Sequence, residues 1–227
     1  MTATGAHRPA QVLVLAKEPA PGRVKTRLCP PCTPGQAARV AAAALADTLD
    51  TISAVAADAR VLVVDGRYPA PPGWTTTAQQ GGSLGERLAN AFADTRKPAT
   101  ATVLVGMDTP QLTSSHLDTA LVLLCAVGGP DAVLGPAADG GWWALGLREP
   151  GHAAVLRDIA TSTAATGAQT LAALRQRGLR VTLLPMLRDV DTAADARAVA
   201  AECPAGGRFS RAVAVNVPQA RPAVPRR

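Results

Sequence analysis

Short apolar runs alternate with longer segments in which apolar residues recur every three to four positions along most of the chain. The short runs are typical of buried strands, and the longer segments are typical of helices with one buried face. The expected strands are residues 11–17, 60–65, 75–79, 102–107, 131–135, 142–147 and 180–187. The expected helices are residues 34–56, 83–95, 114–127, 163–178 and 192–203. Thr33 is placed to cap the first of these helices.

Strands that alternate with helices predict a mainly parallel sheet covered by helices on both faces, which is a three-layer α/β/α architecture. We expect one domain over residues 11–203, preceded by a flexible segment at residues 1–10. Residues 204–227 are rich in Pro, Ala and Arg and show no helical or strand period, so we expect a disordered tail there. In such sheets, ligands bind beyond the carboxyl ends of the strands, where residues distant in sequence meet.

The net charge of +6 is concentrated at the C-terminal end of the sequence. Residues 204–227 contain five arginines and no acidic residue, so the rest of the chain carries a net charge of only +1. This distribution argues against nucleic-acid binding. No apolar run is long enough to span a membrane, and residues 1–10 lack the apolar stretch of a signal peptide. We therefore expect a cytoplasmic protein without a membrane span.

A basic loop, AKEPAPGRVKTRL, follows the first expected strand. Its prolines and Gly22 stop the strand after Lys17. The cations Arg23, Lys25 and Arg27 then follow at every second position, and in an extended stretch they would share one face about 6.6 Å apart. Such a cluster suits a multivalent anion, and the diphosphate of a nucleotide is the obvious candidate. The alternative is a solvated basic loop.

Two acidic residues follow other expected strands. Asp108 comes directly after the strand at residues 102–107, where a carboxylate could hold a divalent cation that bridges a nucleotide's phosphates. The alternative is that Asp108 caps the helix that follows. Asp139 lies in an Asp-Gly-Gly turn, where it could orient an acceptor or act as a general base. The same dipeptide is also typical of a plain hairpin turn.

Two further segments are candidates for the same edge of the sheet. Asp191 follows the last expected strand and could be a second metal ligand or a helix cap; Asp189 is the less favoured of the two acids. The run QQGGSLGER contains Gly82 and Gly85 and leads into a helix. It lacks the lysine of a phosphate-binding loop, so we interpret it as a wall for the base or ribose.

A family resemblance rests on six motifs in order, which span roughly residues 11–202. The motifs are AKEPAPGRVKTRL, QQGGSLGERLANAF, VLVGMDTPQL, GPAADGGWWALGL, TAATGAQTLAAL and DVDTAAD. In this combination the chain resembles the DUF2064 family, which is described as glycosyltransferase-like, with members named for association with radical-SAM and selenium-domain or arsenosugar clusters. The resemblance implies the GT-A fold of nucleotide-diphospho-sugar transferases, a fold also similar to that of small guanylyltransferases.

The resemblance also implies roles for residues, position by position. Gly22, Arg23 and Lys25, with the adjacent Lys17, would bind the nucleotide's phosphates. Gly82 and Gly85 would lie near the base or ribose. Asp108 and Asp191 would hold Mg²⁺ or Mn²⁺. Two departures from the family pattern stand out: Met107 and Thr109 replace smaller or different residues, and residues 161–166 replace a segment that more often begins with Trp before Ser-Thr. The identity of the acceptor is therefore not carried over.

The expected activity is a metal-dependent transferase with Asp108 and Asp139 as catalytic residues, acting on a nucleotide or nucleotide sugar and a small-molecule acceptor. Glycosyl transfer is the first hypothesis. Nucleotidyl transfer from a nucleoside triphosphate, with release of pyrophosphate, is the second, because cations after the first strand suit a triphosphate tail. A non-catalytic nucleotide-binding partner protein is the third.

Overall fold

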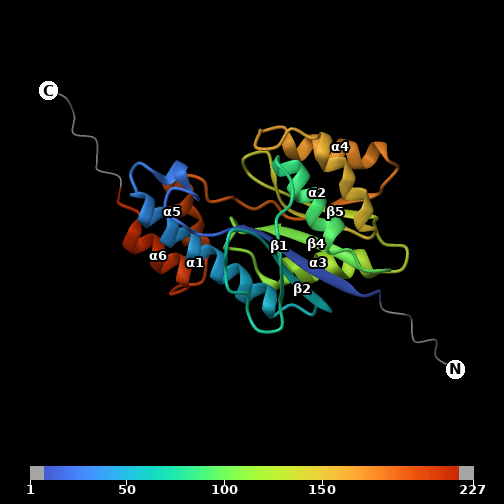
Figure 1. The fold of residues 1–227 in the computed structure, drawn as a ribbon, viewed down its shortest axis with the longest axis horizontal. Coiled ribbons are helices and arrows are strands. Elements are labelled where there is room, and N and C mark those ends of the chain that lie inside the picture. The colour runs from blue at the N-terminus through green and yellow to red at the C-terminus, as the bar shows by residue number, and fades with distance from the viewer. Residues whose placement is uncertain (1–7, 220–227) are drawn as a thin grey trace.

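The computed structural model describes residues 8–219, and seven strands within them form one sheet in the order β3–β2–β1–β4–β6–β5–β7 (Figure 1). The strands are β1 Ala10–Lys17, β2 Ala59–Asp65, β3 Thr75–Ala78, β4 Ala101–Gly106, β5 Ala132–Pro136, β6 Trp142–Leu147 and β7 Val181–Leu183. Only β6 runs antiparallel to its neighbours, β4 and β5; the other pairs are parallel. The mainly parallel sheet predicted from the sequence is thus confirmed.

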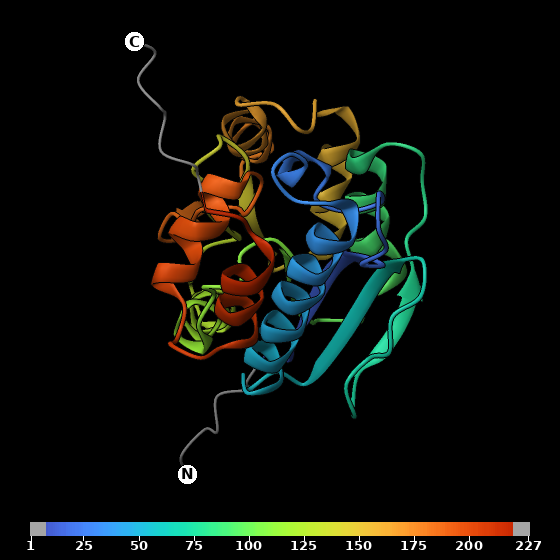
Figure 2. The same ribbon diagram turned by 90° about the vertical axis from the view of Figure 1, so that its left-hand side faces the viewer.

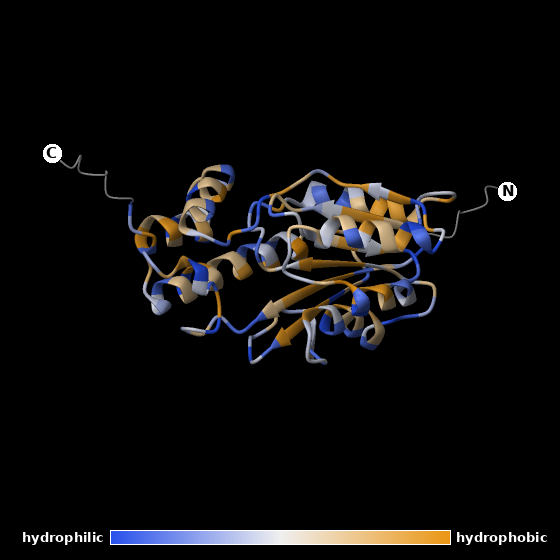
Figure 3. Cartoon of the chain, turned by 90° about the horizontal axis from the view of Figure 1, so that it is seen from above, coloured by the Kyte–Doolittle hydropathy of each residue, from blue (hydrophilic) through white to orange (hydrophobic). Residues whose placement is uncertain are grey.

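Helices cover both faces of this sheet. They are α1 Pro34–Ser53 and α3 Ser114–Cys125 on one face, and α2 Leu84–Asp94, α4 Thr166–Gln176 and the 3₁₀ segment η2 Pro150–Asp158 on the other. The remaining helical elements are α5 Ala193–Glu202, α6 Arg208–Asn216 and the 3₁₀ segment η1 Thr26–Leu28, which pack in a separate core. In β1 the side chains alternate: Val12 and Val14 pack with α1 and α3, while Leu13 packs with α2 and η2 on the other face. Figure 3 shows the apolar strands enclosed between these two helical layers.

The element boundaries follow local chemistry. Thr33 caps α1 in a capping box with Gln36, as predicted. The last strand is shorter than expected, because Pro185 interrupts the run and the chain rejoins β5 only through the isolated bridge between Ala137 and Leu187. The 3₁₀ segments η1 and η2 were not expected. No helix within residues 8–219 has the length and apolar character needed to cross a bilayer.

A third apolar core lies beyond the end of the sheet, where α5 and α6 pack with α1 and η1 (Figures 1 and 2). Phe209 of α6 is fully buried in it, and Asp47 of α1 accepts hydrogen bonds from the Phe209 N–H and from Arg208. The expectation of a disordered tail is therefore wrong for α6. Its apolar residues are spaced four apart at Phe209, Val213 and Val217, a short helical period that the surrounding Pro, Ala and Arg obscured. Residues 220–227 lie outside the described part of the chain.

The predicted flexible N-terminus is also wrong in its last residues. Arg8 donates a hydrogen bond to the Arg148 carbonyl and pairs with Glu149, and Ala10 begins β1. Residues 1–7 lie outside the described residues.

Replacing Phe209 with Ala should lower the free energy of unfolding by about 3–5 kcal/mol, because it empties a fully buried aromatic site. Val215→Ala is the matched control, since Val215 lies on the same helix but is 80 % exposed, and it should change stability by less than about 0.5 kcal/mol. Urea unfolding of the full chain measures both. Equal stability of the two variants would show that α6 does not pack as described.

Candidate functional site

Two segments far apart in sequence are joined at the carboxyl end of β4. The Val190 N–H donates a 2.9 Å hydrogen bond to the Asp108 carbonyl, and Gln111 Nε2 donates a 2.7 Å bond to the Arg188 carbonyl. These bonds hold residues 188–191 against the end of β4 and bring the carboxylates of Asp108 and Asp191 to the same place.

Lys25 lies between these two carboxylates. Its Nζ is 2.7 Å from Asp108 Oδ1 and 3.5 Å from Asp191 Oδ1, and its side chain is only 7 % exposed. Burial alone would lower the pKa of Lys25, but the charges of Asp108 and Asp191 outweigh burial and raise the pKa above its ordinary value. Arg27 is mostly exposed and pairs with Asp191 at 3.0 Å. The structure thus brings Lys25, Asp108 and Asp191 together, as the sequence predicted.

The basic loop is not extended, however. Lys25 has φ 49° and ψ 40°, and it begins the 3₁₀ turn η1, so the three cations do not share a face. Arg23 points elsewhere: it pairs with Asp65 at 3.2 Å and with Glu18 at 3.6 Å. The loop departs from the predicted alternation because Leu28 is buried in the third core and the chain turns to place it there.

Neither predicted metal ligand is a helix cap. Thr113 caps α3 and Thr192 caps α5, each in a capping box, so the capping alternatives for Asp108 and Asp191 are wrong. Asp139 lies in the turn between β5 and β6, where its Oδ1 accepts a 2.8 Å hydrogen bond from the Gly141 N–H. The hairpin interpretation of this dipeptide is therefore correct, and among residues 8–219 the second carboxylate oxygen of Asp139 makes no hydrogen bond.

A small cavity of ≈ 150 Å³ lies beside four of the acids that follow β5 and β7. It is lined by Ala138, Asp139, Arg188, Asp189, Asp191 and Asp195. Asp189 Oδ1 is shut off from solvent and has no hydrogen-bond partner within residues 8–219. Burial, together with the charges of Asp108 and Asp139, raises the pKa of Asp189 to about 7. Asp189 is the less favoured acid in the sequence, yet it lines the same cavity as Asp191. The available signal is the apolar Val190 between the two acids, because residues two apart in an extended segment share a face.

The chemistry of these donors fits a hard divalent cation. Carboxylate oxygens are the ligands that Mg²⁺ prefers, and the unpaired Asp189 Oδ1 is an oxygen donor without a partner among the described residues. No three His, Cys, Asp or Glu side chains of the described residues are already arranged to hold a metal ion. The Lys25 ammonium group instead occupies the space between Asp108 and Asp191.

The glycine-rich turn has a structural role at one of its two predicted positions. A Cβ on Gly85 would lie 2.3 Å from the Leu156 carbonyl oxygen, so Gly85 allows α2 to pack against η2. At Gly82 a Cβ would meet only Glu86 at 3.4 Å, and the Gly82 N–H is held by the Glu86 carboxylate. Gly22 has φ 78°, and a Cβ added there would meet no atom within 4 Å, so the backbone at Gly22 is open to a ligand.

Asp65 is a neighbouring acid that the sequence analysis did not select. It ends β2 and pairs with Arg87 of α2 at 2.8 Å as well as with Arg23. Hydrogen bonding to Arg87 holds the pKa of Asp65 below its usual value, and Lys17 adds to this effect. The rule that pointed to Asp108, an acid at the carboxyl end of a strand, would have found it.

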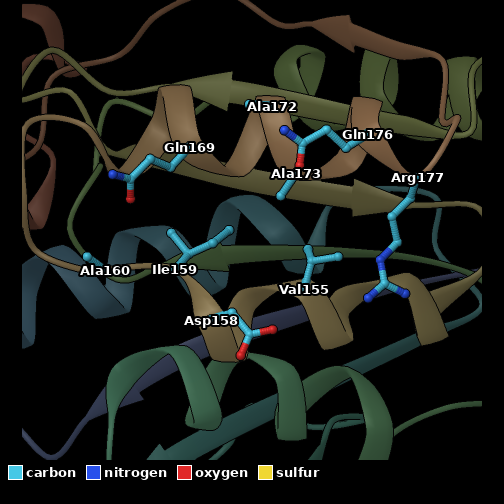
Figure 4. Close-up of a pocket in the computed structure, with 9 residues that line it drawn as sticks. All are labelled: Val155, Asp158, Ile159, Ala160, Gln169, Ala172, Ala173, Gln176 and Arg177. Atoms are coloured by element: carbon cyan, nitrogen blue, oxygen red, sulfur yellow. The ribbon is translucent and has the colours of Figure 1, made fainter.

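A larger hollow of ≈ 660 Å³ lies away from the acids, between η2 and α4 (Figure 4). Its lining is Val155, Asp158, Ile159, Ala160, Gln169, Ala172, Ala173, Gln176 and Arg177. No residue of the lysine and carboxylate cluster contributes to it, so volume alone does not identify the site.

Comparison of the sequence with protein-family models gives a family match. The family model described as "Uncharacterized protein conserved in bacteria (DUF2064)" matches residues 38–163. The chain belongs to the DUF2064 family. No curated protein matches the sequence.

Solved structures extend the DUF2064 match to the fold. A protein from Desulfovibrio desulfuricans G20, provisionally assigned as a nucleotide-diphospho-sugar transferase, is 28% identical with a TM-score of 0.76, over 90% of this chain and 92% of that one. A cytidylyltransferase from Leptospira borgpetersenii has 15% identity and a TM-score of 0.54, with 84% of each chain covered. Rv0371c from Mycobacterium tuberculosis H37Rv has 20% identity and a TM-score of 0.54, over 84% of this chain and 97% of that one. The GT-A-like fold of nucleotide-binding transferases, implied by the resemblance, is confirmed.

Asp189→Asn should stabilise the metal-free protein, and more at pH 8 than at pH 5. The folded-state pKa of Asp189, about 7, is above its unfolded value, so the wild type loses stability as pH rises to 7 while the neutral amide does not. The difference between variant and wild type should grow by on the order of 2 kcal/mol between these pH values. Urea unfolding in EDTA measures it, with the exposed Asp118→Asn as control. A difference independent of pH would mean that Asp189 is ionised normally.

Proposed function

We propose that this DUF2064 protein is a metal-dependent transferase that takes a nucleotide sugar as donor and transfers its glycosyl group to a small-molecule acceptor. The observation that carries the proposal is the meeting of Lys25 with Asp108 and Asp191 at the carboxyl ends of the strands. The 28% identity to the Desulfovibrio protein, over nearly the whole chain, supports a nucleotide-diphospho-sugar donor.

In this proposal the acidic residues bind the metal ion and the basic residues bind the phosphates. Asp108 and Asp191 would hold Mg²⁺ or Mn²⁺ through their carboxylate oxygens, and the ion would supply positive charge against the diphosphate leaving group. Lys25 binds the phosphates, with Arg23 and Lys17 at the same edge, and the open backbone at Gly22 admits them. Gly82 borders the base or ribose, whereas Gly85 contributes by packing α2.

The transfer step itself exchanges one bond for another. The acceptor hydroxyl oxygen forms a bond to the anomeric carbon as the bond from that carbon to the diphosphate oxygen breaks. Asp139 takes the hydroxyl proton, and the Gly141 N–H holds its carboxylate in place. The diphosphate leaves with the electron pair of the broken bond.

Nucleotidyl transfer is the second candidate, and the position of the cations favours it. Lys25 and Arg27 both follow β1 and meet the acid cluster, where they would face a triphosphate tail. In this reaction the acceptor oxygen attacks the α-phosphorus and pyrophosphate leaves. The same acids and the same lysine serve both reactions. The two reactions are therefore distinguished by their products.

Asp108→Asn should reduce turnover about 100–1000-fold, because the metal loses a charged ligand while the side-chain volume is kept. The assay is mass-spectrometric detection of products from a panel of nucleotide sugars and nucleoside triphosphates with Mn²⁺ and cell extract as the source of acceptor. Asp118→Asn, an exposed substitution on α3, is the control and should leave turnover unchanged.

The products distinguish the candidates. A nucleoside diphosphate released from a nucleotide sugar supports glycosyl transfer, and pyrophosphate released from a triphosphate supports nucleotidyl transfer. Thermal stabilisation by a nucleotide without any product would instead indicate a non-catalytic nucleotide-binding protein. Undiminished turnover in Asp108→Asn would remove Asp108 from the mechanism.

A further inference from the structure

Lys25 is engaged with the groups that a metal ion would need. Its Nζ contacts Asp108 Oδ1 at 2.7 Å and Asp191 Oδ1 at 3.5 Å, and its side chain is enclosed. In this arrangement the ammonium group is paired with carboxylates rather than with a phosphate, and it takes one oxygen of each of the two acids. The proposed function needs the ammonium group at the phosphates and those oxygens at the metal, so Lys25 must change partners when substrate binds.

We propose that Lys25 is a resident counter-ion of the metal site, which excludes a free divalent cation and withdraws only when a nucleotide's phosphates offer its ammonium group another partner. The site would then accept the metal as a complex with a nucleoside di- or triphosphate moiety rather than as the free ion. This inference rests on the proposed function, because it requires a metal ion at Asp108 and Asp191.

Exclusion follows from charge and space. A bound Mg²⁺ lies about 2.0–2.1 Å from its oxygen ligands, so it would share Asp108 Oδ1 with an ammonium group only 2.7 Å from that atom. Two cations that close repel each other strongly. Lys25 and Arg27 also balance the charges of Asp108 and Asp191, which leaves these two acids with little attraction for a free cation.

Release requires only a side-chain movement. Leu28, three residues after Lys25, is fully buried in the third core and anchors η1, so the backbone of the loop has a fixed support. The side chain of Lys25 has a flexible four-carbon stem, so its ammonium group can move while the backbone of the loop stays in place. Phosphate oxygens replace the carboxylates as its partners, and the vacated oxygens of Asp108 and Asp191 then bind the metal that arrives with those phosphates.

The test is the binding of Mn²⁺ alone to the full chain, measured by electron paramagnetic resonance of the free ion. Lys25→Gln should bind Mn²⁺ about tenfold or more tightly than the wild type, because it frees both carboxylates. Lys25→Arg keeps the charge and should behave like the wild type. Arg27→Gln is the matched control: it removes a cation from Asp191 but leaves Lys25 on Asp108, so its effect should be several times smaller.

The outcomes separate this inference from the proposed function. If the wild type binds Mn²⁺ as tightly as Lys25→Gln, and Asp108→Asn abolishes that binding, the counter-ion role is wrong while the metal site stands. If Lys25→Gln and the wild type both fail to bind Mn²⁺, the counter-ion role is wrong and the metal dependence of the proposed function fails with it. Tighter binding in Lys25→Gln that Asp108→Asn abolishes supports both.

A second measurement uses the wild type, in case Lys25→Gln does not fold. Amine acetylation followed by mass spectrometry compares Lys25 with the exposed Lys97. Lys25 should react several times more slowly than Lys97 in the free protein. Mg²⁺ alone should leave both rates unchanged, because Lys25 keeps the free ion out. Mg²⁺ with inorganic pyrophosphate should change the rate at Lys25 and not at Lys97, because phosphate oxygens then replace the carboxylates as partners of the ammonium group. A changed rate at Lys25 in Mg²⁺ alone, or an unchanged rate with Mg²⁺ and pyrophosphate, would overturn the inference.

Discussion

The hydrogen bond from the Val190 N–H to the Asp108 carbonyl is the constraint on which the site depends. It joins the end of β4 to a segment that lies much later in the chain, and it fixes the distance between two carboxylates that would otherwise repel. The charge of Lys25 then makes that proximity tolerable, since a buried cation between two acids offsets their repulsion. Backbone hydrogen bonding therefore sets the positions of the two carboxylates, and Lys25 offsets their negative charge.

Most of the sheet could be predicted from the sequence because each strand is a short apolar run bounded by polar or turn residues. Strand β1 shows why: Val12, Leu13 and Val14 are all buried, as a central parallel strand requires. The gathering of Lys25, Asp108 and Asp191 could be predicted for a related reason. Parallel strands end at one edge, so residues that follow them meet there whatever their separation along the chain.

The parts that could not be predicted depend on tertiary contacts. Arg23 and Lys25 are equivalent basic positions in the sequence. In the structure, however, Arg23 pairs with Asp65, whereas Lys25 pairs with Asp108. Gly85 resembles a ligand-binding glycine, yet it is needed for the approach of Leu156. Helix α6 could not be predicted because a nine-residue helix is marginal alone and is stabilised by packing against α1.

The third core has a consequence for the boundaries of the functional unit. Leu28 and Cys32, which flank the end of the basic loop, are buried together with Phe209 and Val213 of the last described helix. The loop proposed to bind phosphate, near the start of the chain, is thus held in place by packing against α6, near the end of the chain. The alternating pattern of strands and helices stops near residue 203. A domain truncated there would keep every acid and every cation of the site. It would nevertheless remove the helix against which the loop that carries Lys25 packs.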